Sequence, residues 1–176
     1  EISPQINEAT IRLLNRHGVE VVVPKKIRCC GSLNHHLGKE EDAHQDFKNN
    51  INIWYEEHQK GNLDAILSNT SGCGTTMKDY GFIFRDDKEL SKKAKVISEL
   101  TKDISEYILE SLKLNIKSKG KKYKVAYHSA CSMQHGQKVH AQPISLLEKT
   151  ENEIMEIPEG HICCGSAGTY NILQSK

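Results

Sequence analysis

Apolar residues along the chain alternate between helical spacing and short β-branched runs. Helical spacing recurs in four segments, the last of which is interrupted near Pro143: Gln5–His17, Glu40–Gln59, Lys88–Leu114 and Gln134–Lys149. Between them lie four short runs that are typical of buried strands: Val19–Val23, Leu63–Ser68, Lys124–His128 and Glu153–Ile157. Short strands that alternate with helices indicate an α/β protein with a parallel sheet.

The chain carries one motif twice. Cys-Cys-Gly-Ser occurs at Cys29–Ser32 and at Cys163–Ser166, where it opens a last predicted helix. Each copy begins five residues after a proline, Pro24 or Pro158, and a Leu-Leu pair and a predicted strand precede both prolines in the same order. We interpret this ordered set as a duplication. The sequence therefore predicts two duplicated Rossmann-like halves with short parallel strands and flanking helices.

The boundary between the halves is set by a Lys- and Gly-rich segment at 117–123, which we interpret as a linker. We expect a first cysteine-rich domain over residues 1–116 and a second over residues 124–176. The repeat also predicts residues outside this sequence. Cys131 lies 32 residues before Cys163, and Cys73 lies 44 residues after Cys29. In the first half, the position that matches Cys131 falls before the first residue. In the second half, the position that matches Cys73 falls after the last residue. We therefore expect a fragment in which each half has lost one of four cysteines.

Composition narrows the class of protein. The 176 residues are 37% hydrophobic and 27% charged, which favours a folded domain with a buried core. A net charge of +1 gives no reason to expect nucleic acid as a partner. No apolar stretch reaches the ~18–20 residues that a transmembrane helix needs. We therefore expect a cytoplasmic protein, at most peripheral at the cytoplasmic face of the inner membrane.

All six cysteines follow predicted strands: Cys29, Cys30, Cys73, Cys131, Cys163 and Cys164. Because binding sites of parallel α/β sheets form outside the carboxyl ends of the strands, these thiols should gather at one edge. Glycines beside them would let backbone amides approach a charged group: Gly31, Gly72, Gly74 and Gly165. Thiolate-only ligation selects zinc, copper(I) or iron–sulfur clusters. Without the short Cys-x2–4-Cys knuckles of zinc sites, wide spacing plus adjacent pairs favours a multi-iron cluster.

Other interpretations of the cysteines stay open at this point. They could be free thiols that fill the core. Cys131 could instead be a catalytic thiolate activated by His128 or His135. The two histidines could also donate hydrogen bonds to ligands of a metal centre. A disulfide framework fits less well, since adjacent cysteines do not pair without strain.

Several stretches resemble a known family. Cys-Cys-Gly-Ser-Ala-Gly-Thr-Tyr-Asn-Ile-Leu-Gln at 163–174 and Cys131-x-x-Gln-His-Gly-Gln resemble the second cysteine-rich (CCG) domain of glycolate oxidase iron–sulfur subunits. Val-Glu-Val-Val-Val-Pro at 19–24 and Ser-Gly-Cys-Gly at 71–74 resemble the first. More distant relatives would include a subunit of heterodisulfide reductase, lactate-utilisation proteins and anaerobic glycerol-3-phosphate dehydrogenase.

The resemblance implies an electron-transfer role. A flavin-containing partner subunit with FAD would oxidise the 2-hydroxy acid, and this subunit would pass electrons toward the quinone pool. The six cysteines would then hold a cluster of the 4Fe–4S type. Thr70 stands where the heterodisulfide-reductase motif has the first cysteine of its Cys-x-x-Cys, so the unusual cluster of that relative is not implied. A thiol–disulfide redox subunit and a metal-free docking module remain the alternatives.

Overall fold

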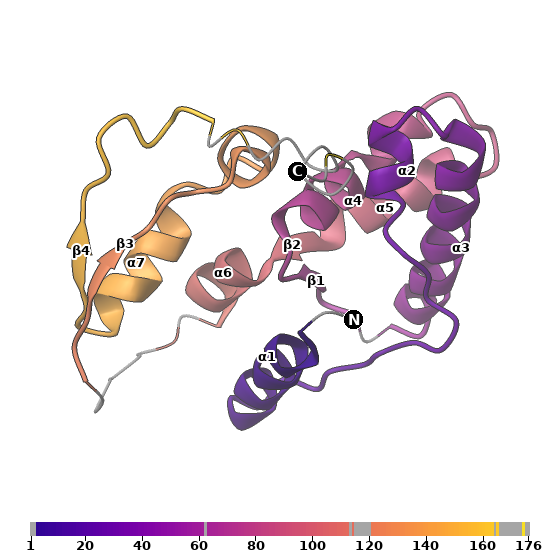
Figure 1. The fold of residues 1–176 in the computed structure, drawn as a ribbon. Coiled ribbons are helices and arrows are strands. Elements are labelled where there is room, and N and C mark those ends of the chain that lie inside the picture. The colour runs from indigo at the N-terminus through magenta and orange to yellow at the C-terminus, as the bar shows by residue number, and fades with distance from the viewer. Residues whose placement is uncertain are drawn as a thin grey trace.

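The computed structural model describes residues 3–61, 63–112, 114, 121–163, 165 and 174. Helices alternate with short parallel strands, so the predicted α/β class is confirmed (Figure 1). The α-helices are α1 (Pro4–Arg16), α2 (Ser32–His36), α3 (Glu40–Gln59), α4 (Ser71–Ile83), α5 (Ser91–Leu100), α6 (Ile104–Glu106) and α7 (Ala141–Lys149). Two π-helical turns are η1 (Tyr107–Ser111) and η2 (Ser132–Gly136). The strands are β1 (Ile66–Ser68), β2 (Thr101–Asp103), β3 (Lys124–Ala126) and β4 (Glu153–Met155).

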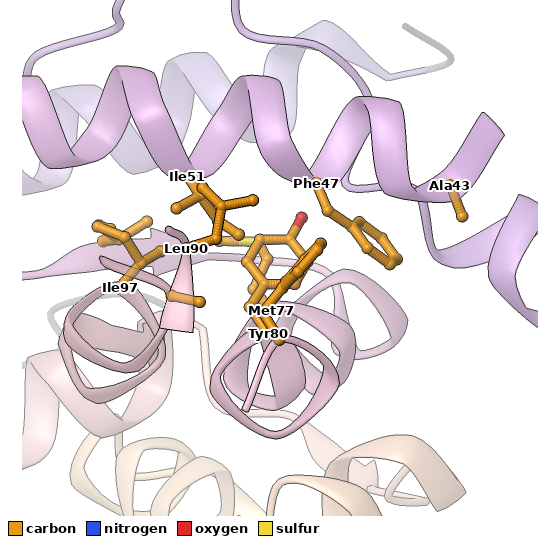
Figure 2. Packing of buried hydrophobic residues seen from close by; sticks show 10 residues of the cluster. Ala43, Phe47, Ile51, Met77, Tyr80, Leu90 and Ile97 are labelled. Carbon is orange, nitrogen blue, oxygen red and sulfur yellow. The ribbon is translucent and has the colours of Figure 1, made fainter. Parts of the chain in front are cut away.

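Helices α3, α4 and α5 enclose the main apolar core. Phe47 and Ile51 lie on one face of α3, at the helical spacing that the sequence predicts, and both are fully buried. Met77 and Tyr80 of α4 and Ile97 of α5 pack against them (Figure 2). This core fixes α4, the helix that carries Cys73, against α3.

The strands form two separate parallel pairs within the described residues, where the sequence analysis expected one sheet. In the first pair β1 lies beside β2, with Ile66 opposite Thr101. In the second β3 lies beside β4, with Lys124 opposite Glu153. Three predicted strands are thus confirmed, each shortened to the three residues that have a neighbouring strand.

The predicted buried strand Val19–Val23 is wrong. These residues are assigned to no strand, and Val22 and Val23 are 55% and 73% exposed. The physical reason is that no strand among the described residues lies alongside them to complete a hydrogen-bond ladder. A β-branched run has strand propensity, but it forms a strand only where it has a partner.

The predicted helix Lys88–Leu114 is wrong in its middle. Helix α5 ends at Leu100, and the next three residues pair with β1 as strand β2. Asp103 then starts a new helix: its side chain accepts from the Ser105 N–H at 2.8 Å, and Glu106 accepts from the Asp103 N–H at 2.7 Å. This reciprocal capping box makes the break a defined start rather than a kink.

Two further predictions need correction. The helix expected over Gln134–Lys149 is split into η2 and α7, and Pro143 lies in the first turn of α7, where a missing N–H costs no helical bond. The stretch 69–74 is rich in turn-forming residues, from which we predict a loop, but α4 already begins at Ser71. The short helix α2 has no counterpart in the sequence analysis. The helix predicted after the second motif lies outside the described residues, and the domain limits 1–116 and 124–176 stay a prediction.

Candidate cysteine site

The first Cys-Cys-Gly-Ser loop is held by the buried side chain of Asn50. From α3, Asn50 accepts a hydrogen bond from the Arg28 N–H at 2.9 Å and donates to the Cys29 carbonyl oxygen at 2.8 Å. Asn50 is fully buried, so these bonds are shielded from water. Gly31 then turns the chain into α2 with a φ of +76°, a left-handed conformation that glycine adopts without steric cost.

The loop brings two thiols from distant parts of the chain together. Cys30 donates a hydrogen bond to Cys73 across 2.9 Å between the two sulfur atoms. Cys73 lies in the first turn of α4, which directly follows β1. Both residues border the apolar core and are half-buried, whereas Cys29 is exposed. Cys73 follows β1 as predicted, whereas the segment 19–23 that precedes Cys30 forms no strand; the two thiols nevertheless meet.

This contact separates the acidities of the two thiols. The hydrogen bond with Cys73, followed by burial, raises the pKa of Cys30 well above its ordinary value. The same hydrogen bond lowers the pKa of Cys73, because it stabilises the thiolate there. Burial raises the pKa of Cys29. The pair thus combines a proton donor, Cys30, with a sulfur that is stabilised as an anion.

Side chains of α4 also hydrogen-bond to the loop that carries Cys29 and Cys30. The Tyr80 hydroxyl donates to the Cys30 carbonyl oxygen at 2.8 Å, and the Thr76 hydroxyl donates to the Ser32 side-chain hydroxyl oxygen at 3.0 Å. Tyr80 and Thr76 are buried. The residues on both sides of Gly31 are therefore hydrogen-bonded to the helix that carries Cys73, Cys30 through its backbone and Ser32 through its side chain.

In the second half, Cys131 and Cys163 come together. Cys131 directly precedes η2, and Cys163 is exposed near the end of the described segment 121–163. The Gly165 N–H donates to the Cys163 sulfur at 3.4 Å. That bond, followed by a hydrogen bond with Cys131, lowers the pKa of Cys163. Cys164 lies outside the described residues.

The two halves meet through small residues next to both cysteine groups. The Thr75 hydroxyl of α4 donates to the Ser132 carbonyl oxygen at 2.9 Å, and the Ser132 hydroxyl donates to the Ser71 hydroxyl oxygen at 2.8 Å. The Gln137 amide donates to the Ser71 carbonyl oxygen at 2.9 Å and packs directly over Gly74. The turn of α4 that carries Cys73 therefore contacts the turn that follows Cys131.

The remaining candidate residues are less closely engaged. Gly72 has no described atom near the position that a Cβ would take. His128 and His135 are exposed, and the His135 ring lies 3.4 Å from the His161 carbonyl oxygen. Among the described residues, no three His, Cys, Asp or Glu side chains gather closely enough to hold a metal ion. Over that part of the chain the thiols meet in pairs.

Three residues that shape the site were absent from the sequence-based candidates. Asn50, Tyr80 and Gln137 carry it through buried hydrogen bonds. A signal existed for Asn50, a polar residue that adjoins the apolar stripe of Phe47 and Ile51 on α3. A buried amide in such a place needs polar partners, and the nearby motif offers unpaired backbone groups.

The sequence matches a known family over both cysteine motifs. The model of the cysteine-rich CCG domain matches residues 1–78 and 125–176, so it covers both motifs and most of the chain. The chain belongs to the cysteine-rich CCG domain family. No solved structure matches it.

Individual members of the CCG family give more detail. The chain is 36% identical over 169 residues to the glycolate oxidase iron-sulfur subunit of Escherichia coli (strain K12), covering 96% of this chain and 41% of that protein. It is 30% identical over 173 residues to a probable glycolate oxidase iron-sulfur subunit of Bacillus subtilis (strain 168), covering 96% and 37%. It is 28% identical over 166 residues to lactate utilization protein A of Geobacillus sp. (strain WCH70), covering 94% and 67%. The chain thus spans about two fifths of the length of the two glycolate oxidase subunits. Over the described residues, no helix is long and apolar enough to cross a membrane.

Proposed function

We propose that this chain is the cysteine-rich part of an iron–sulfur subunit that transfers electrons in a flavin-dependent oxidase or dehydrogenase of 2-hydroxy acids, with glycolate as substrate. A partner subunit carries FAD and takes the electrons from the substrate. This subunit passes them on, one at a time, toward the quinone pool. It acts in the cytoplasm, at most at the cytoplasmic face of the inner membrane. No substrate site is assigned to this chain.

The observation that carries the proposal is the contact between Cys30 and Cys73. Two sulfurs 43 residues apart in the chain converge to 2.9 Å at the end of β1. The converging donors are thiols alone, and soft thiolates select iron–sulfur clusters, zinc or copper(I) over hard cations. Relatives that are named iron-sulfur subunits favour the cluster among these.

The residues of both halves fit such a group. We assign Cys29, Cys30 and Cys73 to one cluster and Cys131, Cys163 and Cys164 to the other, each of the 4Fe–4S type. A cluster of this type exchanges single electrons when bound. The chain's own contribution is to fix the thiols: Asn50 and Tyr80 hold the first loop by its backbone. Hydrogen bonds of this kind to ligand-bearing backbone restrict the geometry of a metal site.

The test uses the full-length subunit, purified anaerobically with its flavin partner. Iron and sulfide analysis and electron paramagnetic resonance are compared between the parent protein and Cys30→Ser. We expect the variant to lose about four irons per protein, with their signal. Met77→Leu is the matched control, because it changes a buried sulfur on α4 at nearly constant volume and should leave the iron content unchanged. Unchanged iron in Cys30→Ser, with circular dichroism showing a folded protein, would overturn the assignment.

The same contact favours a second candidate function, a dithiol redox site. In that case Cys30 and Cys73 would lose two electrons and two protons to a disulfide substrate, which is reduced to two thiols. Cys29 separates the two functions, since it is exposed and is not one of the two sulfurs in the 2.9 Å contact. Cys29→Ser should lower the iron content if a cluster is bound. It should leave the iron content unchanged, and the Cys30–Cys73 dithiol should still reduce a disulfide substrate, if the dithiol is the site.

A further inference from the structure

An apolar groove of about 680 Å³ opens beside the first sheet. Two stretches of backbone line it, residues 19–24 and residues 63–67, the second of which leads into β1. Leu14 of α1, Trp54 of α3 and Tyr107 of η1 are among the other residues that line it. The groove therefore lies between two pieces of chain that both carry strand-forming residues.

Both stretches lack a strand neighbour on the groove side. Among the described residues β1 pairs with β2 alone, and residues 19–24 pair with no strand. The run Val19–Val23 is β-branched, yet Val22 and Val23 are largely exposed. Proteins cover such edges, because open strand edges and apolar surface invite association. The unpaired backbone N–H and C=O groups of the two stretches need hydrogen-bond partners. An extended peptide supplies such partners along its whole length, and a compact ligand does not.

The internal repeat identifies what is missing. Cys163 lies 134 residues after Cys29, so subtracting 134 from a residue number of the second half gives the equivalent position in the first half. By this shift α7 corresponds to residues 7–15, which lie inside α1, and β4 corresponds to residues 19–21. In the second half, β3 precedes the helix and pairs in parallel with β4. It forms a strand–helix–strand unit, in which the helix is the crossover that parallel pairing requires. The first half shows the helix and, at residues 19–21, an unpaired segment in the place of the second strand. The same shift carries β3 to positions before Glu1.

The relatives carry polypeptide for such a strand. The chain covers 41% and 37% of the length of the two glycolate oxidase subunits, so most of each relative lies outside the match. A second copy of this chain is a poorer occupant, because the second half already shows the pairing made within one polypeptide.

We propose that the groove receives a parallel β-strand of the same polypeptide, from the part that precedes this sequence. The strand pairs with residues 19–21 on one edge and with β1 on the other, and joins them and β2 into one four-stranded parallel sheet. Helix α1 is then the crossover helix, as α7 is in the second half. By the register of β3 and β4, the residues nine to eleven positions before Glu1 lie opposite residues 19–21.

Hydrogen exchange in the full-length subunit tests the pairing. We expect the backbone amides of residues 20–23 to exchange at least about tenfold more slowly than those of the neighbouring loop residues 25–27, as paired amides do. Equal exchange in the two segments overturns the proposal. The measurement uses the unmodified protein, so it does not depend on whether a variant folds.

Photo-crosslinking identifies the occupant. The benzophenone amino acid p-benzoylphenylalanine is placed at Val23 of the full-length subunit, and adducts are mapped by mass spectrometry. Adducts within the fifteen residues before Glu1 support the proposal. Adducts to a second copy, adducts to another protein, or no adduct at all overturn it. The control position is Phe82, which is 68% exposed on α4 and does not line the groove, so it should give no adduct to that segment. Neither readout depends on iron, so failure here leaves the proposed function standing.

Discussion

Gly31→Ala is the substitution that tests most directly how the first motif is built. Gly31 has a φ of +76°, and a Cβ there would lie 2.4 Å from Phe47 Cε1 and 3.2 Å from the Ala43 carbonyl oxygen. The Phe47 ring has little room to move. It is fully buried, with its centroid 4.9 Å from that of Tyr80 and 6.3 Å from that of Phe84.

Two costs combine in this variant. A residue with a Cβ in the left-handed region costs about 1–2 kcal/mol. Overpacking a closely packed core costs typically about 1–3 kcal/mol more. We expect Gly31→Ala to lower the free energy of unfolding by about 2–5 kcal/mol. Gly38→Ala is the matched control, because Gly38 has a φ of +73° but no described atom within 4 Å of a Cβ. It should lose only the backbone cost, about 1–2 kcal/mol.

Urea unfolding at 25 °C measures the difference, followed by the fluorescence of Trp54, the single tryptophan of the chain, which packs against the core. With a slope of about 1–3 kcal/mol per molar urea, the extra loss in Gly31→Ala lowers the midpoint by about 1 M relative to Gly38→Ala. Equal midpoints for the two variants would show that Phe47 yields to the new methyl group, and the reasoning from packing would be refuted.

Two further substitutions probe the supports of the site. Asn50→Ala leaves backbone groups of the first motif without their buried side-chain partner, so we expect the free energy of unfolding, measured by thermal unfolding, to fall by about 2–4 kcal/mol. Asn49→Ala, at the half-buried neighbouring position, should cost less than about 1 kcal/mol. Comparable losses would contradict the role of the buried amide. Gly74→Ala forces a Cβ within 2.8 Å of the Gln137 side chain, and should cost about 1–3 kcal/mol and speed amide exchange in η2. Gly72→Ala is the control, because no described atom lies near a Cβ at that position. It should leave the stability and the exchange in η2 unchanged, or raise the stability. Equal effects of Gly72→Ala and Gly74→Ala would show that Gln137 does not pack closely against Gly74.

The sequence predicted best those elements whose apolar pattern also decides their packing. Helix α3 has the predicted limits, because its apolar face meets the core and its first turn is acidic, which favours a helix start. Helix α1 differs from its prediction by one residue at each end. In both, local spacing and tertiary contact point to the same structure.

The failures occur where a distant partner decides. Residues 101–103 continue a helical pattern, yet they form β2 because β1 lies beside them. Residues 19–23 are the opposite case. They have a high strand propensity but form no strand, because no strand among the described residues lies beside them. Gly74 indicated a turn from sequence alone, whereas in the structure it admits the side chain of Gln137 against a helix. Pairing and close approach over long sequence distances leave no local pattern to detect.

The junction between the halves bears on how electrons would move through the subunit. Ser71 and Thr75, which flank Cys73 on α4, bond to Ser132, the residue that follows Cys131. The two cysteine groups are therefore joined by a contact of small side chains and backbone, without the apolar core between them. If each group holds a cluster, as we propose, electrons pass between the halves across this contact. Gly74→Ala then separates two effects: it should slow transfer between the clusters while each half keeps its iron, whereas loss of a thiol removes the cluster itself.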